Sequence, residues 1–165
     1  MSILLTNKID LSLYDLFSNL NYGYGSVYLK DFFVGITELG NSFWYFASFV
    51  LIFLFSYLAK INGLVVLEKY SYLKRLSVFG FTYLLLVGLI TQIVKHFVGR
   101  PRPNHALLDG SFEFSFFTAE SAFHSFPSGH TSTIVAVTII GSLALPGLRY
   151  FFYLCGFFIA LSRVV

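Results

Sequence analysis

The sequence is poor in charged residues. They make up only 12% of the 165-residue chain, about half the share of roughly 25% in soluble proteins. Hydrophobic residues make up 56%. A soluble domain of this size needs more charge to cover its surface, whereas a lipid bilayer removes that need. The composition is therefore not that of an ordinary soluble domain, and it favours a single membrane-inserted domain.

Cysteine is almost absent too. The single residue, Cys155, rules out an intramolecular disulfide and lies in an apolar run, where a packed, inert thiol is expected. One cysteine and four histidines show neither HExxH nor CxxC spacing, so the sequence contains no metal motif. The first residues lack the pattern of a secretory signal, so insertion would rely on internal apolar segments.

Four apolar segments are expected to cross the bilayer as helices. They lie near residues 42–59, 78–98, 129–145 and 150–165. The first two reach the roughly 17–25 residues that a span requires, while the last two are short and need flanking residues or a tight helical hairpin. None shows an amphipathic face, which argues against a buried helix of a soluble bundle. The expected fold is an all-α, multi-spanning membrane bundle with about four transmembrane helices.

The placement of lysine and arginine orients these segments. Residues 60–77 hold four cations against one acid, whereas residues 1–41 hold two lysines against four acids. The positive-inside tendency then puts residues 60–77 in the cytoplasm. It puts residues 1–41, the loop 99–129 and the chain end near Arg163 outside. Residues 11–20 are expected to form a short amphipathic helix on the membrane surface, followed by a loop at 21–25.

The border of the outer loop carries a first group of cations. Lys95 ends an apolar run, and Arg102 follows in Gly99-Arg100-Pro101-Arg102-Pro103. The prolines stop the helix and stiffen the backbone, and a guanidinium can bind two phosphate oxygens at once. A cation at membrane depth costs about 2.5–3.5 kcal/mol, so Lys95 needs a reason to be there. Snorkelling to lipid head groups is the alternative reason.

A second group precedes the third apolar run, at Pro127-Ser128-Gly129-His130. A helix that starts here presents unpaired N–H groups and a partial positive charge, which suit an anion. Ser128 can cap the helix or donate its hydroxyl to phosphate, and Gly129 allows close approach of the backbone. His130 can protonate a departing alkoxide near neutral pH. The alternative is an ordinary serine cap followed by a solvated histidine.

A third, weaker signal is Ser162-Arg163 at the outer end of the fourth segment, where an arginine is usually a head-group anchor. The three groups together resemble the signature of the type 2 phosphatidic acid phosphatase family. In chain order they are Lys95 with Arg102-Pro103, Pro127 to His130, and Ser162-Arg163. The wider superfamily includes acid phosphatases and vanadium haloperoxidases. The resemblance covers roughly residues 36–165. Residues 36–41 also look like the usual lead-in of the family.

The resemblance implies roles for matching residues. Lys95, Arg102 and Arg163 would hold phosphate oxygens, while Ser128 and the Gly129 N–H would add hydrogen bonds. His130 would be the general acid. No metal or other cofactor is implied. Residues 1–41 are expected to be an extracytoplasmic or interfacial segment, and residues 42–165 an incomplete membrane phosphatase domain.

The family also uses a second histidine that attacks phosphorus and an aspartate that orients it. Both would lie further along the third motif than Val165, so the chain is expected to be a truncated or split member. None of His96, His105 and His124 occupies the nucleophile's position. The expectation that follows is a chain that binds phosphate weakly without turning over a phosphomonoester. His105 and His124 are expected to be exposed loop residues, and His96 a packing or head-group residue.

Two readings of function remain. The first is a lipid phosphatase that acts at the outer leaflet through a phosphohistidine, in the inner membrane of a bacterium with its site facing the periplasm. The second is a non-catalytic remnant or subunit; a haloperoxidase ranks below both. The expected partners are the bilayer and a lipid phosphate or pyrophosphate, not nucleic acid. Six phenylalanines in residues 111–126 are expected either to form a lid among acyl chains or to pack on the bundle.

Overall fold

The computed structural model describes Ser12 and residues 26–62, 67–102 and 114–162. These residues form α-helices and short 3₁₀ turns, and none of them is in a strand, which confirms the predicted all-α class. The elements are α2 (Ser26–Glu38), α3 (Ser42–Ile61), α4 (Leu67–Val98), η1 (Ser121–Phe123), α6 (Gly129–Ala144), η2 (Pro146–Leu148) and α7 (Arg149–Leu161).

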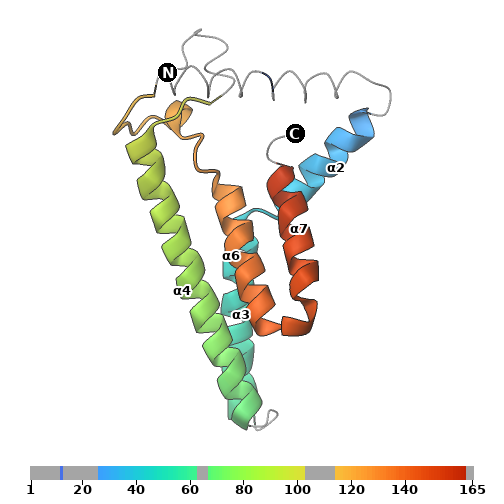
Figure 1. The fold of residues 1–165 in the computed structure, drawn as a ribbon. Helices are drawn as coiled ribbons and strands as arrows, with labels where there is room; N and C mark the ends of the chain where they lie inside the picture. Colours follow the sequence, from blue (N-terminus) through green and yellow to red (C-terminus); the bar gives the residue numbers. More distant parts are fainter. Residues whose placement is uncertain (1–11, 13–25, 63–66, 103–113, 163–165) are drawn as a thin grey trace.

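Two helical hairpins make up the bundle. α3 packs along α4, and α6 packs against both α4 and α7 (Figure 1). The turn between α6 and α7 is the 3₁₀ segment η2, which begins at Pro146, so the predicted Pro-Gly turn is found where the sequence placed it. α2 approaches the carboxyl end of α7.

Two stretches among the described residues are long and apolar enough to cross a membrane, Asp31–Ile61 and Lys69–Val98. Gly129–Ala144 and Pro146–Leu161 are shorter apolar helices, paired as the predicted tight hairpin. The start of α4 differs from the expectation. It begins at Leu67 rather than near residue 78, because lysine, arginine and leucine favour helix and no glycine or proline lies between Leu67 and Gly80.

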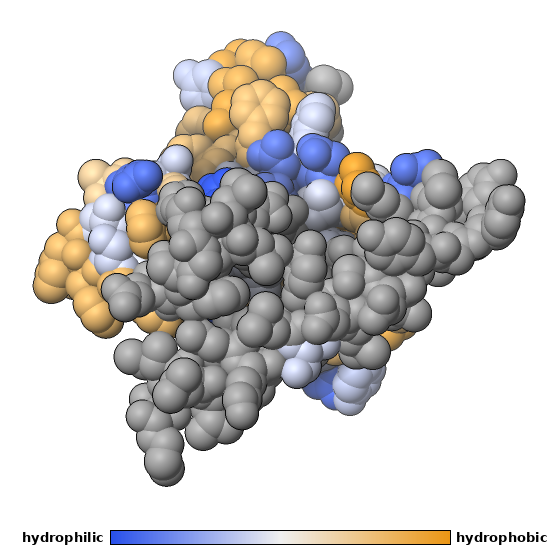
Figure 2. All heavy atoms as spheres, turned by 90° about the horizontal axis from the view of Figure 1, so that it is seen from above, coloured by the Kyte–Doolittle hydropathy of each residue, from blue (hydrophilic) through white to orange (hydrophobic). Residues whose placement is uncertain are grey.

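The outer surfaces of the helices are apolar. Phe43, Leu51 and Phe55 of α3 are each about two-thirds exposed, and similar side chains cover α4 and α7. Seen from the upper end of Figure 1, apolar side chains form the outer flanks of the helices (Figure 2). Soluble monomers rarely expose apolar patches of this extent, whereas lipid tails accept them. The surface therefore fits a membrane protein.

Small residues lie where the helices touch. A Cβ on Gly80 of α4 would collide with the Phe49 ring of α3, and one on Gly156 of α7 would collide with Thr138 of α6. Small residues at such contacts let helix backbones approach closely, which is how helices associate in lipid. The packing thus depends on close contact rather than on a large apolar core.

The two hairpins place the site motifs at one end of the bundle and the cations of residues 60–77 at the other end. The carboxyl ends of α4 and α7 and the amino end of α6 lie at the upper end in Figure 1. The cations of residues 60–77 lie at the opposite end, where α3 ends and α4 begins. The sequence motifs therefore meet at one end, and which side of the membrane this end faces stays a prediction.

Candidate active site

α4 ends at a glycine that no other residue can replace without strain. Gly99 has φ +54°, and its N–H donates to the Lys95 carbonyl oxygen over 3.0 Å. A Cβ at Gly99 would collide with the Ser115 carbonyl oxygen. This ending leaves Lys95, half-buried, in the last turn of α4, where a cation complements the helix dipole.

The strut of residues 100–102 is held by hydrogen bonds as well as by Pro101. The Ser125 hydroxyl lies 3.0 Å from the Arg100 carbonyl oxygen and 2.9 Å from that of Pro101. The Arg102 N–H donates to the Ala122 carbonyl oxygen over 2.8 Å. The first motif is therefore fixed to the segment that leads into α6. Ser125 carries no motif, so the sequence offered no signal for this role.

The second motif forms the start of α6 as predicted. Ser128 is the N-cap, and its hydroxyl oxygen accepts from the Thr131 N–H over 3.4 Å. The Ser132 hydroxyl donates to the Ser128 carbonyl oxygen over 2.9 Å. The peptide bond from Phe126 to Pro127 is cis. A helix start of this kind favours an anion through its first N–H groups and the positive end of its dipole.

The first and second motifs meet at Gly129. The Nζ atom of Lys95 lies 3.6 Å from the position that a Cβ on Gly129 would occupy. The ammonium group of α4 therefore lies beside the amino end of α6. Two positive features, a full charge and the end of a helix dipole, converge on one place.

His130 rests on the turn between α2 and α3. A Cβ on Gly40, which is buried, would lie 2.8 Å from the Cβ of His130 and 3.0 Å from its Cδ2. The imidazole therefore needs a glycine beneath it. Residues 36–41 were predicted as a lead-in, but no sequence signal indicated their contact with the histidine.

The third motif is described only in part. Ser162 is buried at the end of α7, with its hydroxyl 2.6 Å from the Ile159 carbonyl oxygen and 3.2 Å from the Thr37 hydroxyl. This contact ties α7 to α2. Arg163 lies outside the described residues, and so does His105. The side chain of Arg102 is exposed.

The expectation for His124 was wrong. It is half-buried rather than exposed, and its ring centre lies 4.4 Å from that of His96. The Nε2 atom of His124 is 3.0 Å from the Thr118 carbonyl oxygen, and Nδ1 of His96 is 2.7 Å from that of Gln92. The pair packs the loop against α4, because aromatic rings contribute packing energy when they touch.

In the described part of the phenylalanine-rich loop, some rings touch the bundle and others are exposed, and a lid among acyl chains stays a prediction. Phe117 is 76% exposed yet has its ring edge against Phe97 of α4, with ring centres 5.0 Å apart. Phe116 and Phe126 are also exposed, whereas Phe114 and Phe123 are half-buried.

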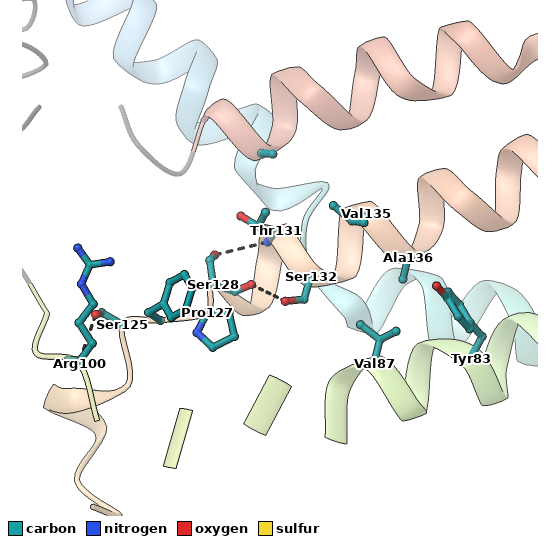
Figure 3. Close-up of a pocket in the computed structure, with 12 residues that line it drawn as sticks. Tyr83, Val87, Arg100, Ser125, Pro127, Ser128, Thr131, Ser132, Val135 and Ala136 are labelled. Carbon is teal, nitrogen blue, oxygen red and sulfur yellow. Dashed lines mark hydrogen bonds between the residues drawn. The ribbon is translucent and has the colours of Figure 1, made fainter. Parts of the chain in front are cut away.

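A pocket of about 610 Å³ opens beside the start of α6 (Figure 3). Arg100, Ser125 and Ser128 lie at one end of it, and side chains of α4 and α6 continue it toward Tyr83. The guanidinium carbon of Arg100 lies 6.0 Å from the centre of the Phe126 ring. Among the described residues there is no group of three or more histidine, cysteine, aspartate or glutamate side chains that could hold a metal ion.

Comparison with known proteins identifies the family to which this chain is similar. Residues 76–165, more than half of the chain, match the PAP2 superfamily. A lipid A 1-phosphatase of Rhizobium etli is 34% identical over 94 residues, which cover 57% of this chain and 40% of that protein. One of Rhizobium johnstonii is 34% identical over 94 residues, covering 57% and 38%. The alignments thus span about two-fifths of these relatives. No solved structure matches the chain.

Proposed function

The chain belongs to the PAP2 superfamily, and on that premise we propose that it serves a membrane phosphatase that removes phosphate from lipid head groups. The lipid A 1-phosphatases among its relatives support a lipid phosphate as the substrate class. The proposed place is the inner membrane of a bacterium, with the site at the outer leaflet and facing the periplasm.

The observation that carries the proposal is the contact between Lys95 and the amino end of α6. The ammonium group lies 3.6 Å from the Cβ position of Gly129, beside the Ser128 cap. A phosphate placed there would accept hydrogen bonds from the lysine and from the first N–H groups of the helix. Because these groups are held in place before the substrate binds, they can stabilise the charge that develops on the phosphoryl oxygens.

The proposed roles follow the motif. Lys95, Arg102 and Arg163 hold phosphate oxygens, and Ser128 and Gly129 add hydrogen bonds. A histidine nucleophile, to which no residue of this chain is assigned, bonds to phosphorus as the P–O bond to the lipid breaks. His130 gives its proton to the departing alkoxide, and water then releases inorganic phosphate from the phosphohistidine.

The test is the release of inorganic phosphate from phosphatidate and from lipid A in mixed micelles, by the protein expressed from its own gene. We expect His130→Ala to lower the rate by about 10²-fold or more, the usual contribution of a general acid. His96→Gln, which changes a histidine outside the site, should keep most of the activity. Equal rates for His130→Ala and the wild type would overturn the proposed role of His130.

The same experiment distinguishes the second reading, in which the protein binds phosphate without hydrolysing any lipid. It predicts that orthovanadate or inorganic phosphate binds at the Lys95 site while no preparation releases phosphate from any lipid. Release that depends on His130 would contradict it.

A further inference from the structure

The pocket beside α6 changes in character along its length. Its mouth holds Arg100, Ser125 and the Ser128 cap, and its far part is lined by Val87, Val135 and other apolar side chains (Figure 3). The polar end adjoins the proposed phosphate site. The apolar end lies between helices that face lipid.

One face of α6 forms a wall of this pocket. Ser128, Thr131, Ser132, Val135 and Ala136 recur at intervals of three and four residues, so they share one side of the helix. The wall runs from Ser128 to Ala136, eight helical steps of about 1.5 Å each, or about 12 Å along the helix axis. Tyr83 and Val87 of α4, one turn apart, form the facing wall. The space between these walls is called the α4–α6 groove below.

We propose that the α4–α6 groove receives one acyl chain of the lipid whose phosphate binds at the amino end of α6. The inference rests on the proposed function and adds to it the place of the lipid tail. A ligand with an anionic head and an apolar tail matches the order of the lining, from Arg100 at the mouth to Val87 inside. The volume of about 610 Å³ lies within the range of ordinary small-molecule sites.

Tyr83 marks the inner end of the groove. It lies at the opposite end of the pocket from Arg100, beyond Val87 and Ala136 (Figure 3). Its ring stacks on Phe79 of the same helix, with ring centres 5.8 Å apart, which holds it in place. The terminal methyl of a chain that fills the groove should therefore lie near Tyr83.

Photocrosslinking tests this placement without requiring turnover. The probe is an alkyl phosphonate with a diazirine at the far end of its chain, added to the protein in nanodiscs of phosphatidylcholine. We expect mass spectrometry to find adducts on α4 near Tyr83 to Val87 and on α6 near Val135 to Ala136. Inorganic phosphate or orthovanadate should reduce these adducts at least tenfold.

The outcomes separate the two proposals. Adducts that phosphate removes but that lie on the outer face of α3, for example at Val50 or Leu51, would overturn the groove and leave the phosphate site standing. Adducts in the groove that phosphate does not affect would retain the groove as a lipid site and contradict the proposed function. Adducts found equally in the groove and on the outer face of α3, and unaffected by phosphate, would overturn both the groove and the phosphate site.

A filling substitution supplies a second measurement. Val87→Phe narrows the groove and should lower kcat/KM for a long-chain lipid phosphate at least tenfold, while hydrolysis of glycerol 3-phosphate stays within twofold. Val50→Phe makes the same change on the exposed face of α3 and is the matched control. An equal loss on both substrates in Val87→Phe would show damage to the phosphate site and contradict a tail-specific role.

Discussion

Gly40 makes the sharpest prediction, because it links a turn outside the motifs to the proposed general acid. Gly40→Ala places a methyl group 2.8 Å from the Cβ of His130 and 3.0 Å from its Cδ2. Carbon atoms are most stable roughly 3.5–4.0 Å apart, so the histidine has to move by roughly 0.7 Å. The backbone at Gly40 has an ordinary φ, so the effect comes from the contact with His130 and from the Thr37 carbonyl oxygen, which would lie 3.1 Å from the new methyl group.

Gly40→Ala is expected to lower both the activity and the stability. A misplacement of about 1 Å at a reacting group can lower the rate by about 10²-fold. Overpacking of this kind costs about 1–3 kcal/mol of stability. Gly35→Ala in α2 is the matched control, since nothing lies within 4 Å of a Cβ there. It should leave the rate unchanged and raise stability by roughly 0.5–1 kcal/mol.

The assay is phosphate release from phosphatidate by the protein expressed from its own gene, measured beside thermal unfolding for Gly40→Ala, His130→Ala and the double variant. If Gly40 acts through His130, the double variant should be no slower than His130→Ala alone, because contacting residues are not additive. Multiplying losses would refute this reasoning. So would a Gly40→Ala protein as active as the Gly35→Ala control.

Three further substitutions test the framework of the site. Ser128→Ala removes the N-cap and should cost about 1 kcal/mol of stability in thermal or denaturant unfolding; an unchanged midpoint would contradict the cap. Gly99→Ala collides with the Ser115 carbonyl oxygen at φ +54°, so it should abolish activity and lower the unfolding temperature, and wild-type behaviour would refute the assigned turn. Gly156→Ala places a methyl group against the Thr138 hydroxyl and should lower stability. Adding Thr138→Ala should restore stability, because the Cβ at position 138 then lies at an ordinary 3.4 Å. If the double variant stays unstable, the packing of α6 on α7 is contradicted.

Much of the bundle followed from the sequence because a bilayer imposes simple rules. An apolar run of the right length predicted α3. The Pro-Gly turn at residue 146 predicted the α6–α7 hairpin, and the serine before the third run predicted the α6 cap. The start of α4 was missed because a charged segment was read as a loop. Lysine and arginine favour helix as strongly as leucine does, so charge located the membrane boundary but not the end of the helix.

The parts of the site that the sequence did not reveal are contacts between distant segments. Three such contacts join residues that are 24 to 125 positions apart in the sequence. They are Gly40 with His130, Ser125 with Pro101, and Thr37 with Ser162. No periodicity or motif encodes such pairs. The exposed position assigned to His124 failed for the same reason, since its contact with His96 arises only when the loop folds back on α4.

The meeting of Lys95 with the start of α6 is the centre of this account, and the affinity for orthovanadate tests it most directly. Calorimetry would compare Lys95→Ala with Lys74→Ala, which removes the same charge from the opposite end of the same helix. Loss of a hydrogen bond to a charged group costs about 1.5–3 kcal/mol, so Lys95→Ala should weaken binding about 10- to 100-fold. Lys74→Ala should bind as the wild type does, and equal affinities for the two variants would contradict a phosphate site at this place.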